Sequence, residues 1–239
     1  MAFIHGNGSR LYANGREISE FVRSISGPRE VEASESTTMR TRDRTYVPGL
    51  RNGTLSVDGL WDSSGLATSV DEYLDSIKGV RDLPFCWTLG EESFGSIAYG
   101  LLGQMTSYEV STPHDDIAEF SLEVQGSGQR DRLIVLHPLG SEDTDPGESA
   151  VLSVAALSTK GAVIYVQSLA GTATAAADIA VKHSADQTTW VDLVTYTLPA
   201  ALPGATRFSV SGTVQRHVKL TWAPGASPSV PFTVGFSRK

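Results

Sequence analysis

Apolar and polar residues alternate in short runs over the first part of the chain. The alternation is clearest over residues 118–125 and recurs over 54–59. Successive side chains of a β-strand point to opposite faces of a sheet, so this pattern predicts strands with one face on a core and the other in water. The pairs Asn14-Gly15 and Asn52-Gly53 predict turns between such strands, because both residue types tolerate positive φ angles. This part of the chain is therefore expected to be mostly β.

One segment has helical periodicity instead. Apolar side chains recur over residues 70–77 at the i, i+3, i+4 and i+7 positions that share one face of a helix. Ser69 and Glu72 have the spacing of a capping box, and Gly79 can end the helix. A single α-helix is therefore predicted from about 69 to 78, with its apolar face laid on one side of a sheet.

The last part of the chain, residues 150–239, contains no helical pattern. It divides into about seven apolar runs separated by turn residues, and these runs lie near 150–157, 162–168, 178–183, 189–197, 206–211, 213–222 and 230–236. Short strands at this spacing are typical of an antiparallel β-sandwich. We expect a sandwich of the immunoglobulin-like or jelly-roll type, and the spacing alone leaves its topology open.

The two parts differ in charge. Residues 1–138 carry 12 basic and 20 acidic side chains, a net charge of −8, whereas residues 150–239 carry seven basic and three acidic ones, a net charge of +4. Between them, residues 139–149 combine Pro and Gly with four acidic side chains and no basic one. This is the composition of an exposed linker between domains. We therefore predict an N-terminal domain over 1–138, an acidic linker over 139–149 and a C-terminal β-sandwich over 150–239.

The overall composition narrows the function classes. The 239 residues, of which 40% are hydrophobic and 19% charged, are typical of a folded globular protein. The net charge of −8 disfavours a dedicated binder of nucleic-acid phosphates, since such proteins carry clustered Lys and Arg. No apolar run reaches the roughly 20 residues that a membrane span needs, so no membrane insertion is predicted.

No motif in the sequence predicts an active site. The five histidines lack the spacing of a zinc site, and neither a G-x-S-x-G elbow nor a nucleotide-binding glycine loop is present. His114, Asp115 and Asp116 form the best acid–base cluster, for which a polar turn is the favoured interpretation. The single cysteine, Cys86, is flanked by aromatic residues and is expected to be a small buried side chain. We therefore expect neither an enzyme nor a bound metal or cofactor.

Several segments of residues 1–138 follow one another in a recognisable order. They are Phe21–Ser26, Arg40–Gly49, Asn52–Asp62 and, after the predicted helix, the runs 95–100, 107–110 and 116–126. This order resembles the major tail tube proteins of long, non-contractile-tailed bacteriophages (siphophages). The resemblance implies a tail-tube β-sandwich or barrel with one flanking α-helix, six copies of which form a ring, with rings stacked into a tube in the tail of the virion.

The resemblance also implies partners. The tube conducts DNA and encloses a tape-measure protein, and it contacts tail terminator or initiator proteins, with assembly in the cytoplasm of the bacterial host. In a ring the edge strands pair with neighbouring subunits, so that no edge stays open. The C-terminal sandwich would decorate the outside of the tube, where its net charge of +4 suits contact with an anionic host surface.

A long polar segment, residues 31–49, resembles the loop of this family that orders between rings. A mobile surface loop is the alternative interpretation. The two interpretations are compatible if the loop is mobile in the monomer and becomes ordered in the tube. The residues expected to make inter-ring contacts are Glu35, Arg40, Arg42, Asp43 and Arg44.

The acidic balance of residues 1–138 fits a conduit for DNA. Lys or Arg facing the lumen would bind phosphate and slow the passage of DNA, whereas carboxylates leave it free to slide. Asp58, Glu119 and Glu123 lie on the polar faces of predicted strands and are the candidates for the lumen surface. The alternative is that they face solvent on the outside of the tube.

The competing class of function is a glycan-binding or host-surface adhesion module that forms no tube. Trp190 and Trp222 can provide a sugar-stacking platform on the C-terminal sandwich. Each also sits in an alternating strand, which favours core packing. Sugar binding by residues 150–239, with a monomeric full chain, would favour this class.

Overall fold

The computed structural model describes residues 6–40, 42–62, 69–138, 147–169, 177–198, 203–223 and 231–239. Within these residues the chain is mainly β, as predicted, with 17 strands, one α-helix and one short 3-10 turn (Ser19–Phe21). They form two compact units. Unit 1 draws on the described residues of Met1–Ser19, Leu83–Gly100 and Asp131–Lys239, and unit 2 on those of Glu20–Asp82 and Leu101–Arg130.

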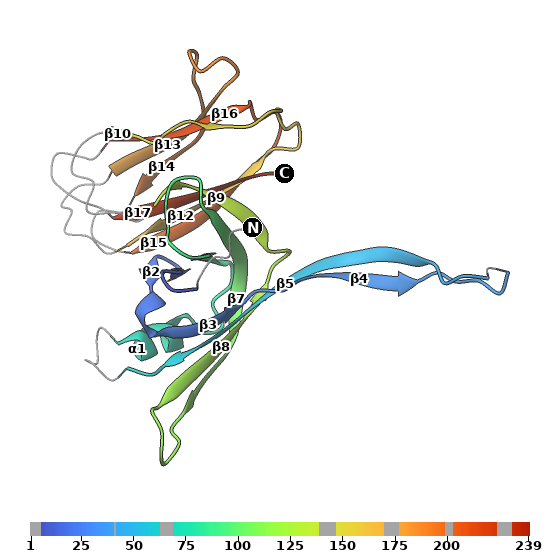
Figure 1. Ribbon diagram of the computed structural model, residues 1–239, viewed down its shortest axis with the longest axis vertical. Helices are drawn as coiled ribbons and strands as arrows, with labels where there is room; N and C mark the ends of the chain where they lie inside the picture. The colour runs from blue at the N-terminus through green and yellow to red at the C-terminus, as the bar shows by residue number, and fades with distance from the viewer. Residues whose placement is uncertain are drawn as a thin grey trace. The chain divides into compact units, whose positions relative to one another are not determined.

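Unit 1 contains two antiparallel sheets (Figure 1). Its strands are β1 (Leu11–Ala13), β2 (Arg16–Glu17), β6 (Leu83–Thr88), the first residues of β7 (Ile97–Ser111), β9 (Asp131–His137), β10 (Gly147–Glu148), β11 (Leu152–Ser153), β12 (Ala162–Ser168), β13 (Ala177–Ser184), β14 (Val191–Leu198), β15 (Gly204–Val210), β16 (His217–Ala223) and β17 (Phe232–Arg238). One sheet has the order β15-β12-β17-β9-β7-β6-β1-β2. The other has the order β10-β16-β13-β14, with β11 also paired to β16.

Strand β12 lies between two apolar cores. On one face, Ala162, Ile164 and Val166 belong to the core between the two sheets, where β12, β17 and β9 pack against β13, β14 and β16. On the other face, Val163 and Tyr165 belong to a second core with side chains of β1, β6, β7 and β9. All seven residues of β12 are buried. A strand covered on both faces needs a continuous apolar run, and the sequence over 162–166 is such a run.

The second core is also held by a buried amide. Gln167 of β12 is 1% exposed, and its side-chain nitrogen donates a hydrogen bond to the carbonyl oxygen of Pro84 (3.0 Å). Its side-chain oxygen accepts a hydrogen bond from the N–H of Gly15 (2.7 Å). Buried backbone groups need such partners, because an unpaired one costs about 1–3 kcal/mol. The turn at Gly15 and strand β6 are therefore tied to β12 by hydrogen bonds as well as by packing.

Unit 2 is a sheet with one helix and two protruding hairpins. Its elements are β3 (Val22–Ser26), β4 (Arg29–Glu35), β5 (Tyr46–Leu60), α1 (Val70–Ile77), the remainder of β7 and β8 (Glu119–Gly126). The second half of β5 pairs with β3 and β8, while its first half pairs only with β4. Figure 1 shows β4 and the first half of β5 extending away from the rest of unit 2. We call this hairpin, residues 29–53, the arm.

The predicted helix and its cap are confirmed. Helix α1 begins after Ser69, whose hydroxyl accepts a hydrogen bond from the N–H of Glu72 (3.2 Å). The side chains of Val70, Leu74 and Ile77 are buried, as their shared face predicts. The helix thus presents one apolar side and leaves its polar side in water.

One predicted turn is confirmed and one is wrong. Asn14 and Gly15 have φ angles of 46° and 85° and connect the paired strands β1 and β2, as predicted. Asn52 and Gly53, in contrast, lie inside β5. Gly53 is needed for a different reason: a Cβ atom there would lie 2.7 Å from the backbone nitrogen of Arg130. The glycine permits a close approach of two backbones and does not reverse the chain.

The limits of the two units differ from the predicted ranges 1–138 and 150–239. Strand β9 pairs with β17, close to the C-terminus, and belongs with it to unit 1. Of the predicted acidic linker, residues 139–146 lie outside the described residues, while Gly147 and Glu148 form β10 and pair with β16. The linker over 139–149 stays a prediction. Independent folding of 1–138 and 150–239 stays a prediction. Among the described residues, no helix has the length and apolarity to cross a membrane.

Candidate assembly surfaces

The arm is a two-stranded ribbon without a core. Every residue of β4 is exposed, and so are the first six residues of β5. Within the described residues β4 pairs only with β5, so its other edge has unpaired backbone groups. Such an edge is a template for pairing with another chain. An isolated two-stranded hairpin is marginal in water, and among the described residues no third strand pairs with the arm.

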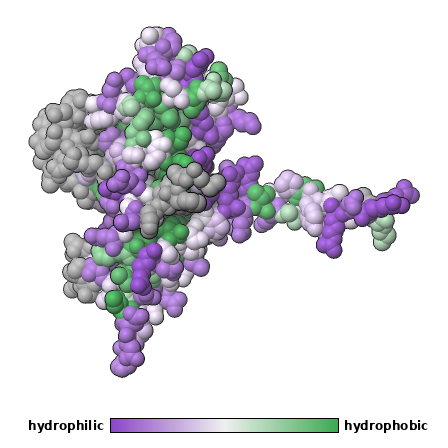
Figure 2. Space-filling model, in the orientation of Figure 1, coloured by the Kyte–Doolittle hydropathy of each residue, from purple (hydrophilic) through white to green (hydrophobic). Residues whose placement is uncertain are grey.

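Apolar side chains of the arm are exposed to water. In the strand register, Ala33 lies opposite Pro48 and Glu35 opposite Tyr46, so these side chains share a face with Val31. Val31 is 49% exposed and Tyr46 54% exposed. Figure 2 shows hydrophobic patches interrupting the hydrophilic surface of the arm. Exposed apolar side chains gathered on one element mark an interaction surface.

The predicted inter-ring residues all lie at the far end of the arm. Glu35 is the last residue of β4, and Arg40, Arg42, Asp43 and Arg44 lie in the turn that joins β4 to β5. We call residues 36–45 the arm tip. The expectation of a long loop over 31–49 is corrected here, because residues up to Glu35 and from Tyr46 onward form paired strands. The alternation of apolar and polar residues that predicts strands elsewhere in the chain is weak in this polar segment, so the segment does not look like a strand in sequence.

Hydrogen bonds close the base of the arm tip. The N–H of Ser36 donates to the carbonyl oxygen of Thr45 (2.8 Å), and the N–H of Thr45 donates to the hydroxyl of Thr37 (3.1 Å). The pairing of β4 with β5 is thereby prolonged by one residue pair. The basic side chains of the tip are consequently carried on a defined hairpin end.

The three predicted lumen residues share one face of the unit 2 sheet. Asp58 of β5 lies opposite Ser121 of β8, and Glu119 and Glu123 alternate with buried side chains of the same strand. A hydroxyl hydrogen of Ser24 is donated to the carboxylate of Asp58 (2.9 Å), and Arg23 forms an ion pair with Glu119. Both side chains of that ion pair are about half exposed, so it adds little to stability.

Glu109 of β7 belongs to the same acidic face and was not predicted. It lies opposite Ser121, while Ser107 lies opposite Glu123. Between Met105 and Ser107 the register shifts by one residue, which is a β-bulge. Met105 is fully buried, so uninterrupted alternation would place Glu109 on the buried face as well. No local signal in the sequence marks this bulge.

The predicted cluster of His114, Asp115 and Asp116 lies in the turn between β7 and β8. His114 and Asp115 are 99% and 94% exposed, with 3.7 Å between the imidazole Nε2 and the carboxylate. The N–H of Ile117 donates to the carboxylate of Asp116 (2.7 Å). The arrangement is that of an exposed polar turn.

The interior of unit 1 holds ionisable groups that are satisfied by neighbours. Glu92, whose side chain is 1% exposed, accepts hydrogen bonds from Tyr12 and from Thr233 (2.6 Å). Burial and the charge of Glu92 raise the pKa of Tyr12 well above its usual range. Burial raises the pKa of the Cys86 thiol to about 12. These groups hold the core together, and within the described residues no cluster of metal-ligating side chains is found.

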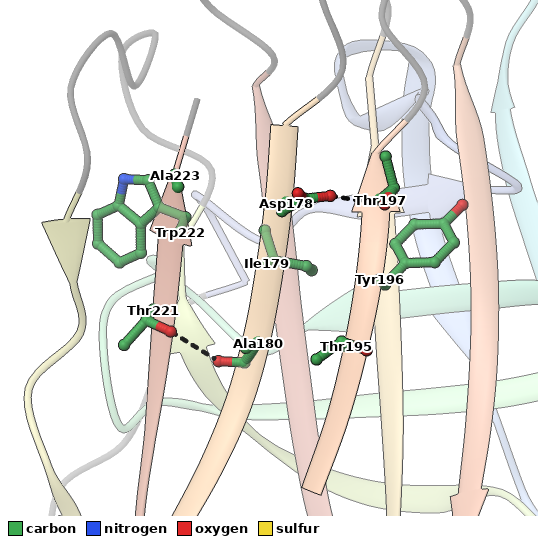
Figure 3. Close-up of a pocket in the computed structure, with 9 residues that line it drawn as sticks. All are labelled: Asp178, Ile179, Ala180, Thr195, Tyr196, Thr197, Thr221, Trp222 and Ala223. Atoms are coloured by element: carbon green, nitrogen blue, oxygen red, sulfur yellow. Dashed lines mark hydrogen bonds between the residues drawn. The ribbon is translucent and has the colours of Figure 1, made fainter. Parts of the chain in front are cut away.

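Three strands of the smaller sheet of unit 1, β13, β14 and β16, line an open pocket that we call the dish (Figure 3). Its volume is about 460 Å³. The dish is lined by Asp178, Ile179 and Ala180 of β13, Thr195, Tyr196 and Thr197 of β14, and Thr221, Trp222 and Ala223 of β16. The hydroxyl of Thr197 donates to the carboxylate of Asp178 (2.6 Å), and that of Thr221 donates to the carbonyl of Ala180 (3.4 Å).

The two predicted tryptophans lie on different faces of this sheet. Trp222 packs edge-to-face against His137 and Phe232 and belongs to the side chains that pack on the core. The ring of Trp190 lies 4.6 Å from the ammonium group of Lys219, which shares the outer face with Thr221. The two indoles therefore do not form a common platform. Contact of either with a ligand stays a prediction.

Comparison with known proteins finds similarity in structure alone. No protein-family model and no curated protein matches the sequence. Among solved structures, the chain is similar to a protein of the virion of a native gene transfer agent particle (TM-score 0.44, 14% identity), over 54% of this chain and 97% of that chain. It is similar to the SPP1 Dit protein, a hub of the adsorption apparatus in phages that infect Gram-positive bacteria (TM-score 0.41, 13% identity), over 95% and 97% of the two chains. It is also similar to the SPP1 tail tube (TM-score 0.44, 12% identity), over 54% and 78%. These neighbours are structural proteins of phage-like tails and virions, and at these scores and identities the likeness does not assign a function.

Proposed function

We propose that this chain is a structural subunit of a bacteriophage tail that assembles with copies of itself. In this proposal the subunits form hexameric rings, the rings stack into a tube around the tape-measure protein, and the tube conducts DNA from the virion. The single observation that carries the proposal is the arm, a ribbon exposed on both faces with an open edge and unburied apolar side chains.

The arm favours assembly over a role as a monomer for a physical reason. No residue of β4 is buried within the chain, so little burial offsets the conformational entropy lost in ordering it. Pairing of the open edge with a neighbour and burial of Val31 and Tyr46 would supply the missing stabilisation. Closed rings satisfy every edge, whereas an open arrangement leaves one exposed.

The acidic face of unit 2 supports a conduit for DNA. Asp58, Glu109, Glu119 and Glu123 share this face, and Arg23 is the basic side chain paired with it among the described residues. A surface of this charge repels phosphate and leaves DNA solvated. Reversal of Asp58, Glu119 and Glu123 to Lys should slow DNA delivery while tubes still form, and normal infectivity of that variant would count against a lumenal position.

Electron microscopy of the purified full chain tests the assembly directly. We expect rings or hollow tubes in negative stain and a sedimenting species larger than the monomer. A matched variant removes the arm: because Glu30 lies opposite Asn52, residues 31–51 can be replaced by a two-residue Asn-Gly turn. This variant should fold with unchanged thermal stability and remain monomeric. A wild-type chain that stays monomeric at every concentration would contradict the proposal.

A second candidate function rests on the dish. Its carboxylate and hydroxyl groups are the kind that hydrogen-bond to sugars, and Trp190 lies on the same face of the sheet. A glycan-binding or host-surface adhesion module would use this face without forming a tube. Titration of the full chain with a panel of glycans tests it, with Asp178→Ala as the variant expected to lose binding and Asp115→Ala as the control.

A further inference from the structure

Two protrusions of unit 2 carry opposite charges. The arm tip, residues 36–45, contains Arg40, Arg42 and Arg44 against the single acidic residue Asp43, a net charge of +2. The second protrusion is the end of the β7–β8 hairpin, residues 109–119, which contains four carboxylates and no Lys or Arg, a net charge of −4. We call it the acidic turn.

Each protrusion also exposes apolar side chains beside its charges. Met39 of the arm tip is fully exposed. In the acidic turn Ile117 is 60% and Val110 39% exposed. Within the described residues, no ion pair joins Arg40, Arg42 or Arg44 to a carboxylate. An apolar centre with charged surroundings is the usual composition of a protein–protein contact.

The two protrusions lie at opposite ends of the same strand pair. Thr54 lies opposite Gln125 where the arm begins, and Leu60 lies opposite Glu119 where the acidic turn begins. Six residue steps separate these pairs, which is about 20 Å along a strand. The arm then extends a further seven residues away from the acidic turn, and Figure 1 shows the two hairpins leaving the sheet in different directions. The arm tip therefore cannot reach the acidic turn of its own chain.

We propose that the arm tip of one copy docks on the acidic turn of a second copy. This inference rests on the proposed function and names the contact through which copies associate. The basic side chains of the tip face the carboxylates Glu109, Asp115 and Asp116, and Met39 packs against Ile117 and Val110. The contact joins two different surfaces of the same chain, so it is heterologous and can repeat from copy to copy.

Charge reversal in two variants tests the contact. The first variant carries Arg40→Glu, Arg42→Glu and Arg44→Glu, and the second carries Glu109→Arg, Asp115→Arg and Asp116→Arg. In each variant alone the two protrusions carry the same sign, so we expect association to weaken by on the order of tenfold or more. In an equimolar mixture every arm tip meets a turn of opposite sign in an alternating arrangement, and assembly should return. Association of the wild type should likewise weaken in about 1 M salt, where the Debye length is about 3 Å.

A matched control for the first variant has the same change in charge elsewhere. Lys78, Lys160 and Arg216 are exposed and lie outside both protrusions. Their joint reversal to Glu should leave assembly as in the wild type. All variants should unfold at the temperature of the wild type, because the substituted side chains are exposed.

A cross-linking measurement separates this contact from ring formation. Met39→Cys and Ile117→Cys chains, mixed and treated with a short bismaleimide, should give a covalent dimer that neither chain gives alone. The natural cysteine does not interfere, because Cys86 is buried and the pKa of its thiol is raised. A cross-linked dimer without rings would support the docking and contradict the proposed tube. Rings without the cross-link, and indifferent to charge reversal, would overturn the docking and leave the proposed function standing. Absence of both would overturn both.

Discussion

Strands β12 and β4 have the same length and opposite surroundings. Each has seven residues, and those of β12 are all buried while those of β4 are all exposed. β12 contributes side chains to two cores at once, and β4 contributes to none within the chain. The two strands therefore differ in what they stabilise. Strand β12 stabilises the folded monomer, and by our proposal β4 stabilises the assembly.

The chemistry of a cysteine provides the largest expected contrast between the two environments. Cys86 packs in the core that covers one face of β12, and burial raises the pKa of its thiol to about 12. Thiolate is the reactive form, so alkylation at pH 8 should be slower than for an exposed thiol by about a thousandfold or more. In a Val31→Cys variant the new thiol lies on the exposed arm and should react rapidly, which mass spectrometry of the iodoacetamide-treated protein would measure. Rapid modification of Cys86 in the wild type would contradict the buried position.

The same Val31→Cys thiol sharpens the role of β4. We expect it to become protected when the protein is concentrated enough to assemble, because the apolar face of the arm is then covered. Unchanged reactivity in assembled material would show that this face stays in water.

A truncation in each strand tests their contributions to the monomer. Ile164 is fully buried between the sheets, so Ile164→Ala should lower the free energy of unfolding by about 2–5 kcal/mol. Val31→Ala, in the exposed strand, should change it by less than about 0.5 kcal/mol. Urea unfolding of both variants, at concentrations where the wild type is monomeric, would measure the difference. Equal losses would mean that the arm is packed in the monomer as well.

Most elements of this contrast can be predicted from the sequence, but not all. The run over 162–168 predicts a strand, but not that both of its faces are buried, and the helix is predicted by its cap at Ser69 and its apolar periodicity. Asn52-Gly53 fails as a turn signal, because the reason for Gly53 is a backbone almost 80 residues away in sequence, at Arg130. Local patterns contain no information about such an approach.

Long-range pairing and irregularity explain the other misses. The pairing of β9 with β17 joins segments about 100 residues apart, and the hydrogen bonds of Gln167 to Gly15 and Pro84 join segments about 150 and 80 residues apart. Glu109 lies on the acidic face of the sheet because of a β-bulge, which the alternation of apolar and polar residues does not reveal. The acidic face could thus be predicted in part, from Asp58, Glu119 and Glu123, and its fourth carboxylate could not.

The buried amide next to β12 gives the third prediction. Gln167→Leu keeps the volume of the side chain but leaves the carbonyl of Pro84 and the N–H of Gly15 without a partner, so we expect a loss of about 1–3 kcal/mol in the free energy of unfolding. Gln125→Leu is the control, since the side chain of Gln125 is exposed on unit 2. An effect no larger than that of the control would mean that these backbone groups find other partners.

The smallest expected effect concerns a histidine whose burial is intermediate between that of β12 and that of β4. His183 of β13 is partly buried, and its Nδ1 accepts a hydrogen bond from the N–H of Gln215 (3.3 Å). Burial first, and then the charge of Arg238, lower the pKa of His183 in the folded protein below its usual 6.5. The unfolded chain therefore binds a proton more readily, so stability is complete above about pH 6.5 and declines as the pH falls below it. His183→Gln should reduce this decline between pH 7 and pH 5, by less than the effect of Gln167→Leu, as chemical unfolding at several pH values would measure. The same slope in both proteins would show that protonation of His183 does not destabilise the sandwich, and that this part of β13 behaves as exposed surface.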